Sequence, residues 1–347
     1  MRQRRVLLIF FAFALVFSFV AGLTACNDKD EAQSEDTAEE SVEGDELSEY
    51  PVTIYGITVN SRPSRVVSLS PSLTEKLYDI GLDESLVGVS DYCDYPPHAA
   101  SFTKCGTGQI PNIDRILVLK PHVVLAQAPL SEEDARLLSD EGVDIIIIPP
   151  AKTVREWKES YVSLARLLEG EHVGAAVGQG FTGTLQSRLD ELRKNFGPYA
   201  DEHGRKKVLY LLMLDFTVAT GDTLENELME LIGLDNIAGG QNGWQYPEEL
   251  ASGESRADFE AINLIFMDEN FVTITDLEQS SFYRGLQATL QDWFVYIDSI
   301  VLERQSLRAL GIIERMGRAA YPDAIPEIPF VEDDDGEDDS GEEDGED

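Results

Sequence analysis

The stretch from Arg65 to Gly81 reads RVVSLSPSLTEKLYDIG and contains one complete strand-to-helix unit. Its first part, Arg65–Leu69, is valine-rich and short, which predicts a strand. The segment Ser72–Ile80 predicts a helix that begins at Ser72, because Glu75 follows three residues later at the spacing of a capping box. Gly81 is a typical end for such a helix. A strand followed at once by a helix is the repeating unit of an α/β fold.

The same alternation continues beyond this unit. Further strands are predicted at Ser85–Val89, Val123–Ala126 and Val143–Ile148. Helices are predicted at Asn112–Leu119 and Ser131–Glu141. Because the last of these strands is apolar on both faces, we expect a parallel sheet that helices cover on both sides.

The middle of the chain, Thr153–Phe196, shows an almost purely helical pattern with a weak point at Glu169–Gly170. Its second half, His172–Phe196, carries apolar residues every three or four positions, which predicts one long amphipathic helix. A helix of about 25 residues would span about 37 Å. Four glycines in this half lower the helical propensity and favour a bend.

After Lys207 the α/β alternation resumes. Strands are predicted at Val208–Leu214, Asn263–Met267 and Phe294–Ile297, and helices at Leu224–Ile232 and Glu303–Ala320. The fold class is therefore α/β, with two Rossmann-like lobes of parallel sheet, 51–152 and 207–330, joined by a helical linker, 153–206. A single bridging helix is stiff, so we expect modest closure on a ligand.

The N-terminal segment 1–26 has the features of an export signal. Three arginines precede an uncharged apolar run, Val6–Val20, which is shorter than the roughly 20 residues of a membrane span. The run is followed by Leu23-Thr24-Ala25-Cys26, which resembles the bacterial lipoprotein signal. The resemblance implies lipidation of Cys26 and an extracytoplasmic protein anchored to the cell membrane. The alternatives are an ordinary signal peptide and an uncleaved anchor.

Two acidic segments flank the predicted lobes. Residues 27–50 contain eleven acidic side chains, and Glu332–Asp347 contains twelve. We expect a solvated, disordered tether at 27–50 and a disordered tail at 331–347, because such segments bury too little apolar surface to fold. The net charge of the chain is -38, and the part between the two segments is itself acidic. This charge argues against binding to nucleic acid through a broad positive surface.

Four motifs in order resemble the periplasmic binding proteins for iron chelates and vitamin B12. The motifs are RVVSLSP with Thr74-Glu75, GVSDYCDYPP at 88–97, NIDRI at 112–116 and LKPHVV at 119–124. The Tyr-x-Asp-Tyr-Pro-Pro run resembles the B12-binding branch most. The resemblance covers residues 65–150 well and the remainder loosely. It implies a monomeric solute-binding protein that works with an ABC permease and its ATPase and holds its ligand between two lobes.

The resemblance also implies one acidic docking residue on each lobe that meets arginines of the permease. On the first lobe this residue is Asp114, where the family usually has glutamate. On the second lobe Glu254 matches the Ser-x-Glu pattern best, with Glu248 and Glu249 as rivals. The alternative for each is an ordinary solvated carboxylate.

Aromatic residues are the candidate ligand contacts. A corrinoid is flat and largely apolar on its faces, and tyrosine and tryptophan offer area together with a polar group. The candidates are Tyr92, Tyr95, Trp244, Tyr246 and, past the first strand of the second lobe, Asp215 and Phe216. The alternative is local packing of these rings. The run Gly106–Gln109 lacks the ring that the B12 branch often places there, so another corrinoid, a ferric siderophore or haem is the alternative ligand.

The cysteines, the histidines and the lack of catalytic motifs give no support for a metal-binding or enzymatic function. Cys93 and Cys105 lie close enough in one loop region to predict a disulfide in an oxidising compartment; two independent thiols are the alternative. The four histidines show no metal-ligand spacing, so we expect no metal site and no cofactor other than the transported ligand. Phosphate loops, nucleophile elbows and triads are absent from the sequence, so we expect no enzyme. A ligand-free scaffold or adhesin is the remote alternative.

Overall fold

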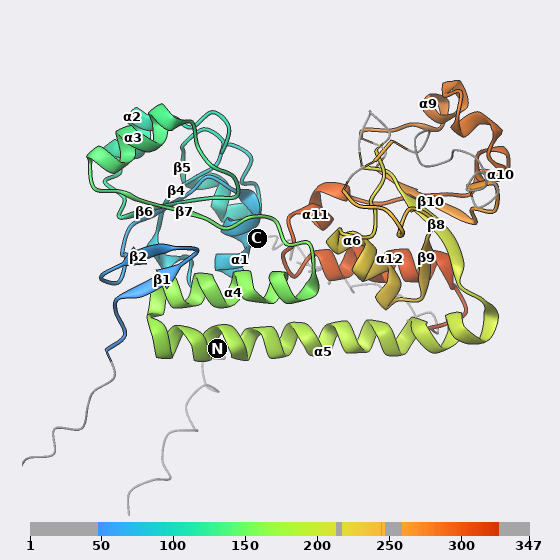
Figure 1. The fold of residues 1–347 in the computed structure, drawn as a ribbon, viewed down its shortest axis with the longest axis horizontal. Coiled ribbons are helices and arrows are strands. Elements are labelled where there is room, and N and C mark those ends of the chain that lie inside the picture. The colour runs from blue at the N-terminus through green and yellow to red at the C-terminus, as the bar shows by residue number, and fades with distance from the viewer. Residues whose placement is uncertain (1–47, 213–216, 244, 247–258, 269, 326–347) are drawn as a thin grey trace, which may run out of the picture. The chain divides into compact units, whose positions relative to one another are not determined.

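The computed structural model describes residues 48–212, 217–243, 245–246, 259–268 and 270–325. The first lobe, called the N-lobe here, is built on a parallel sheet with the strand order β5-β4-β3-β6-β7 (Figure 1). Its strands are β3 (Val66–Ser68), β4 (Leu86–Val89), β5 (Thr103–Lys104), β6 (Val123–Ala126) and β7 (Asp144–Ile147). A short antiparallel hairpin, β1 (Val52–Ile54) with β2 (Ile57–Val59), precedes it. The predicted parallel sheet is confirmed.

Helices cover both faces of this sheet. On one face, Leu73 and Leu77 of α1 (Pro71–Asp79) pack into a cluster with strand residues such as Val123. On the other face, Ile116 of α2 (Ile113–Val118) and Leu138 of α3 (Glu132–Asp140) pack against Val67 and Val124. Successive strand residues point to opposite faces, so strands with no polar face need cover on both sides.

The N-cap of helix α1 lies two residues earlier than the sequence predicted. Ser70 is the N-cap, since its hydroxyl accepts a hydrogen bond from the Leu73 amide, and Pro71 occupies the first turn. Proline suits this position because its fixed φ is helical and its missing N–H has no partner there in any case. The predicted start at Ser72, with Glu75 in a capping box, is therefore wrong. Glu75 is instead buried, and its carboxylate pairs with two arginines that come later in the chain.

The linker consists of two packed helices, α4 (Val154–Glu169) and α5 (Glu171–His203), separated by Gly170 at φ +93°. Helix α5 has 33 residues and continues past the predicted end at Phe196. Helix α4 also joins the lobes: Trp157 and Tyr161 pack into the core of the second lobe, while Leu164 packs into that of the N-lobe. The prediction of a single bridging helix is thus incomplete, because two helices share that role.

The chain enters the fold earlier than predicted. Glu49, assigned to the tether, accepts hydrogen bonds on its carboxylate from the amides of His172 and Val173 in the first turn of α5. Tyr50 donates its hydroxyl proton to the Leu167 carbonyl oxygen at 2.9 Å. A carboxylate at a helix N-terminus satisfies amides that have no partner within the helix. Glu49 and Tyr50 are therefore attached to the fold at the turn between α4 and α5.

The second lobe, called the C-lobe here, has a parallel sheet with the strand order β11-β10-β8-β9. The strands are β8 (Lys206–Tyr210), β9 (Leu234–Asn236), β10 (Leu264–Met267) and β11 (Phe294–Tyr296). The helices are α6 (Leu224–Leu231), α9 (Ile274–Gln279), α10 (Gln287–Leu290), α11 (Ser299–Glu303) and α12 (Ala309–Ala320). Leu189 and Phe196 of α5 pack into its core. Within the described residues, no helix is both long and apolar enough to cross a membrane.

The predicted last helix, Glu303–Ala320, is interrupted in the structure. Helix α11 ends at Glu303, α12 begins at Ala309, and Gln305 between them adopts a left-handed φ of 51°. The Gln305 side chain compensates for this conformation by exchanging hydrogen bonds with the backbone N–H and carbonyl of Ala151 at 2.8 and 2.9 Å. The interruption therefore holds residues 304–308 against the end of the N-lobe, where they contact both lobes.

Candidate functional site

A loop with two exposed tyrosines, residues 91–97, follows β4 in the N-lobe and is called the aromatic loop here. Tyr92 is 70% exposed and Tyr95 is 40% exposed. Between them Cys93 is buried, with its sulfur 3.3 Å from the Thr74 hydroxyl. The loop leaves the carboxyl end of a parallel strand, which is where open α/β sheets bind ligands. It combines a buried anchor with two rings presented to the outside.

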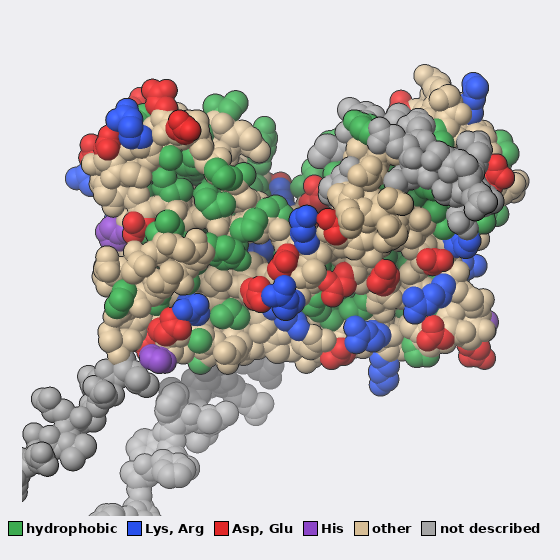
Figure 2. All heavy atoms as spheres, viewed as in Figure 1, with side chains coloured by type: hydrophobic (Ala, Val, Ile, Leu, Met, Phe, Trp, Pro, Cys, Tyr) green, Lys and Arg blue, Asp and Glu red, His purple; other side chains and the backbone are tan. Residues whose placement is uncertain are grey.

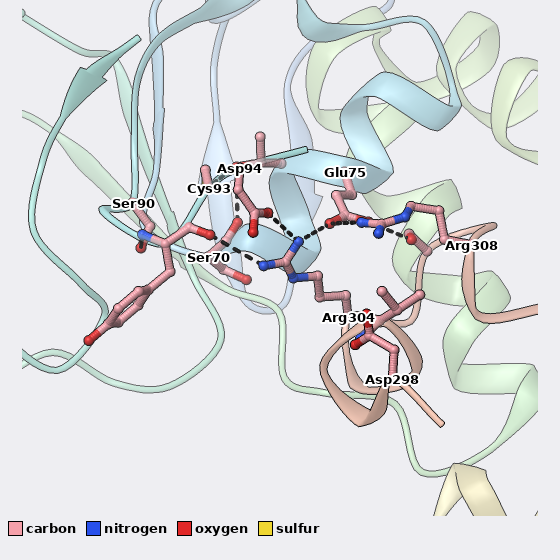
Figure 3. Close-up of polar contacts among 12 residues, drawn as sticks. Ser70, Glu75, Ser90, Cys93, Asp94, Asp298, Arg304 and Arg308 are labelled. Carbon is pink, nitrogen blue, oxygen red and sulfur yellow. Dashed lines mark hydrogen bonds and ion pairs between the residues drawn. The ribbon is translucent and has the colours of Figure 1, made fainter. Parts of the chain in front are cut away.

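The aromatic loop meets two arginines of the C-lobe. The Arg304 guanidinium donates to Glu75 Oε1 at 2.7 Å, to Asp94 Oδ1 at 2.5 Å and to the Tyr92 carbonyl at 3.3 Å (Figure 3). Arg308 donates to the same Glu75 oxygen at 3.2 Å, and its guanidinium lies 4.0 Å from the centre of the Tyr95 ring. Arginines stack on aromatic faces in this way. The two predicted tyrosines thus lie where the lobes touch.

Glu75 is the centre of this junction. Its side chain is 1% exposed, and its second oxygen accepts from the Ser306 hydroxyl at 2.7 Å. Two guanidiniums face two carboxylates, Glu75 and Asp94, so the charges balance. The hydrogen bond from Arg304 lowers the pKa of Asp94. Burial alone would lower the pKa of Arg304, but its bonds to Asp94 and Glu75 raise it. Such pairing is what makes a buried charge tolerable.

A second set of contacts continues the junction along α1 and α4. Tyr161 donates to Asp79 Oδ2 at 2.6 Å, and the Leu307 amide donates to the same oxygen at 2.9 Å. Lys76 is fully buried with its ammonium 5.7 Å from the centre of the Tyr161 ring. Burial, opposed by the charge of Asp79, lowers the pKa of Lys76 to about 7. Hydrogen bonds from α1, α4 and residues 304–308 therefore tie the two lobes together.

The C-lobe places three carboxylates near one another beside this junction. Asp268 accepts hydrogen bonds from the amide and hydroxyl of Ser299 and from Asn270. Burial raises the pKa of Glu225. Burial, reinforced by the charges of Glu225 and Asp268, raises the pKa of Glu303 to about 8. Among the described residues, no group of three or more His, Cys, Asp or Glu is arranged to hold a metal ion.

The raised pKa of Glu303 predicts a pH-dependent stability. The folded protein keeps a proton that the unfolded chain releases above its ordinary pKa of 4.5, so stability should fall as the pH rises from about 4.5 to 8. The slope from this group is at most about 1.4 kcal/mol per pH unit. Urea unfolding at several pH values between about 5 and 7 should show that Glu303→Gln flattens this slope.

The control for that measurement is Glu278→Gln, on the exposed side of α9, which should leave the slope unchanged. The range stops near pH 7 because Lys76 contributes the opposite sign above it: its folded pKa of about 7 lies below the ordinary 10.5, so stability rises with pH there. An unchanged slope in Glu303→Gln would show that Glu303 takes up no proton on folding.

Two other predicted site residues, Tyr246 and Asp114, lie on the surface of the described structure. Tyr246 is 44% exposed on the C-lobe, after a turn in which the Gly243 amide donates to Asp222. Asp114 is exposed in the first turn of α2 and lines a surface groove with Ile110 and Arg115. Trp244, Asp215, Phe216, Glu254 and Cys26 lie outside the described residues.

The predicted disulfide is not formed. Cys93 and Cys105 are both free and buried. Cys93 belongs to the hydrophobic cluster on the α1 side of the N-lobe sheet, and Cys105 belongs to the cluster on the α2 and α3 side. A disulfide needs Cβ atoms about 4 Å apart that face each other, and the intervening sheet prevents this. The alternative of two independent thiols is the one that the structure supports.

The sequence did not predict the roles of Glu75, Arg304 and Arg308 in the junction. Glu75 and Lys76 lie between Leu73 and Leu77, which are buried one helical turn apart. Charged residues within such an apolar stretch are the available signal that a buried partner exists. The two arginines gave no signal, because spaced basic residues are ordinary on an exposed helix.

Comparisons with known proteins agree with this architecture. The periplasmic binding protein family matches residues 66–294. The uncharacterized ABC transporter substrate-binding lipoprotein YvrC of Bacillus subtilis is 24% identical over 288 residues, which cover 80% of this chain and 88% of YvrC. A vitamin B12-binding protein of Photorhabdus laumondii is 30% identical over 197 residues, which cover 55% of this chain and 65% of that protein.

Solved structures share the fold. The periplasmic vitamin B12-binding protein BtuF of Vibrio cholerae matches with a TM-score of 0.57 and 23% identity, over 75% of this chain and 97% of BtuF. The periplasmic heme-binding protein RhuT from Roseiflexus matches with a TM-score of 0.62 and 19% identity, over 76% of this chain and 99% of RhuT. At these identities the matches concern the fold and leave the ligand open.

Proposed function

We propose, on the premise that this chain belongs to the periplasmic binding protein family, that it delivers a corrinoid to an ABC importer. The observation that carries the proposal is the aromatic loop, which presents Tyr92 and Tyr95 where the two lobes meet. A large flat ligand needs broad apolar contact with a few polar groups for orientation, and exposed tyrosines supply both. The B12-binding relative, at 30% identity, supports the same ligand class.

A ferric siderophore or haem is the second candidate. The observation in its favour is Arg308, whose side chain is 31% exposed beside the Tyr95 ring. Guanidinium groups bind carboxylates and other oxyanions in a bidentate manner, whereas the rim of a cobalamin carries mostly neutral amides. The fold similarity to a heme-binding protein is compatible with this candidate. Both candidates use the same place in the fold.

The attachment and docking sites complete the proposal. We propose that Cys26 carries the lipid anchor and that Asp114 and Glu254 meet arginines of the permease. Asp114 is supported by its exposure in the first turn of α2 and by the neighbouring Ile110, an exposed apolar side chain. Figure 2 shows acidic and basic side chains on the N-lobe surface over α2 and α3, with hydrophobic side chains beside them toward β5. Family members are solute-binding proteins, and we propose no catalytic activity for this chain.

Equilibrium dialysis of the full chain against cyanocobalamin, cobinamide, haem and a ferric siderophore tests the proposal, because all four ligands are coloured. We expect saturable binding of a corrinoid, weakened about tenfold or more in Tyr92→Ala, since loss of a central aromatic contact costs on the order of 1–2 kcal/mol. The matched control is Tyr55→Ala, an exposed tyrosine in the β1–β2 turn.

Saturable binding of haem or the siderophore alone would support a solute-binding role and contradict the choice of a corrinoid as the ligand. Equal loss of affinity in Tyr92→Ala and Tyr55→Ala would show that the aromatic loop does not contact the ligand. Binding of none of the four ligands would contradict the proposal and favour the scaffold alternative.

A further inference from the structure

The aromatic loop belongs to the N-lobe, yet its outer part is held by a residue of the C-lobe. We infer that Arg304 is a positioning residue that clamps this loop across the junction, so that the presentation of Tyr92 and Tyr95 depends on contact between the lobes. The inference rests on the proposed function in one respect: the aromatic loop is taken to be part of the ligand site. The clamp itself is a property of the protein without ligand.

The contacts of Arg304 place it across the loop. It binds the Tyr92 carbonyl and the Asp94 carboxylate, the two neighbours of the buried Cys93. Its third partner, Glu75, lies on α1 and is itself buried, so it fixes the guanidinium on the α1 side (Figure 3). The Arg304 side chain is 11% exposed, so water replaces these bonds poorly. A planar fork of donors can serve three acceptors at once, which a lysine ammonium on a flexible stem does less well.

Bonds within the N-lobe hold the base of the loop and the backbone of Cys93. Lys104 donates to the Ser90 and Cys93 carbonyls, and the Gly106 amide donates to Asp91. These contacts tie the base of the loop and the Cys93 carbonyl to β5 and to the turn after it. Among the described residues, the hydrogen bonds that the Tyr92 carbonyl and the Asp94 side chain make to another part of the fold go to Arg304. A movement that separates the lobes would therefore release the outer part of the loop first.

The loop contains its own reporter, and the lobe contains a control. Cys93 is 2% exposed and lies between the two residues that Arg304 holds. Cys105 is fully buried in the hydrophobic cluster on the opposite face of the same sheet. Burial raises the pKa of both thiols, so both react slowly while the protein is closed. Opening of the loop alone exposes Cys93, whereas general loosening of the N-lobe exposes both.

The experiment is alkylation of the full chain by iodoacetamide, with the modified cysteines located by peptide mass spectrometry. In Arg304→Gln we expect the rate at Cys93 to rise about tenfold or more, because charge-assisted hydrogen bonds are lost, while the rate at Cys105 stays as in the unaltered chain. Arg304→Lys should give an intermediate rate at Cys93. Arg136→Gln, which breaks an exposed ion pair on α3, is the control and should change neither rate.

Asp94→Asn provides a variant that is safe for folding, since the Asp94 side chain is 71% exposed. It should raise the rate at Cys93 in the same direction as Arg304→Gln. An unchanged rate at Cys93 in both variants, or a parallel rise at Cys93 and Cys105, would overturn the clamp. The alkylation is carried out without ligand, so its result does not depend on the dialysis experiment. A failure of the dialysis experiment would contradict the proposed function but not the clamp.

Discussion

Replacing Glu75 with alanine is expected to lower the free energy of unfolding by about 3–5 kcal/mol, because the change leaves buried cations without their anion. Arg304 and Arg308 both donate to Glu75, and the Ser306 hydroxyl donates to its second oxygen. Alanine removes all three acceptor contacts and leaves a cavity on α1. The measurement is urea-induced unfolding of the full chain, followed by far-UV circular dichroism.

Two further variants make this test specific. Glu75→Gln keeps the shape and one acceptor oxygen, so its loss of stability should lie between that of alanine and zero. Glu191→Ala removes an exposed carboxylate that pairs with Arg188 on the surface of α5, and it should change the stability by less than about 1 kcal/mol. Equal effects of Glu75→Ala and Glu191→Ala would mean that the junction contributes nothing to folding.

The lobes and their parallel sheets could be predicted from the sequence because their signals are local. Short apolar strands, such as Val123–Ala126, alternate with amphipathic helices along the chain, and each signal needs only neighbouring residues. The placement of the aromatic loop also followed from order along the chain, since it comes directly after β4. Tyr92 and Tyr95 were therefore predicted as site residues before their partners were known.

The partners could not be predicted, because they depend on contacts between residues far apart in the sequence. Glu75 and Arg304 are 229 residues apart, and each has an ordinary local interpretation, a helix cap and an exposed helical cation. The break at Gln305 was missed for the same reason: its left-handed backbone is stabilised by Ala151 at the end of the N-lobe. The disulfide prediction failed because closeness in sequence did not reveal that a sheet separates the two thiols.

The glycines of α5 have different effects on the helix, depending on what surrounds each of them. Glycine lowers helical propensity, and the four glycines at 174, 178, 180 and 183 predicted a bend. The structure instead divides them by their surroundings. Gly174 and Gly178 are buried against α4, where a Cβ would meet its backbone, whereas Gly180 and Gly183 have nothing within 4 Å of a Cβ position. The first pair permits close packing of the two linker helices, and the second pair only weakens the helix.

Alanine substitutions at two of these glycines should therefore have opposite signs. A Cβ on Gly174 would lie 2.4 Å from the Ala165 carbonyl oxygen and 2.5 Å from the Arg166 Cα, so Gly174→Ala must push α4 away from α5. We expect a loss of about 1–3 kcal/mol of stability from this overpacking. Gly180→Ala meets open space and should gain about 0.5–1 kcal/mol, since alanine is the better helix former.

Urea unfolding of the two variants side by side measures this difference, and both carry the same chemical change on the same helix. The comparison removes the intrinsic preference for alanine, so what remains is the contact between α4 and α5. Because α4 also packs into the cores of both lobes, a displaced α4 should disturb the junction at Tyr161 and Asp79 as well. Stabilisation by both substitutions would show that the linker helices are not closely packed at Gly174.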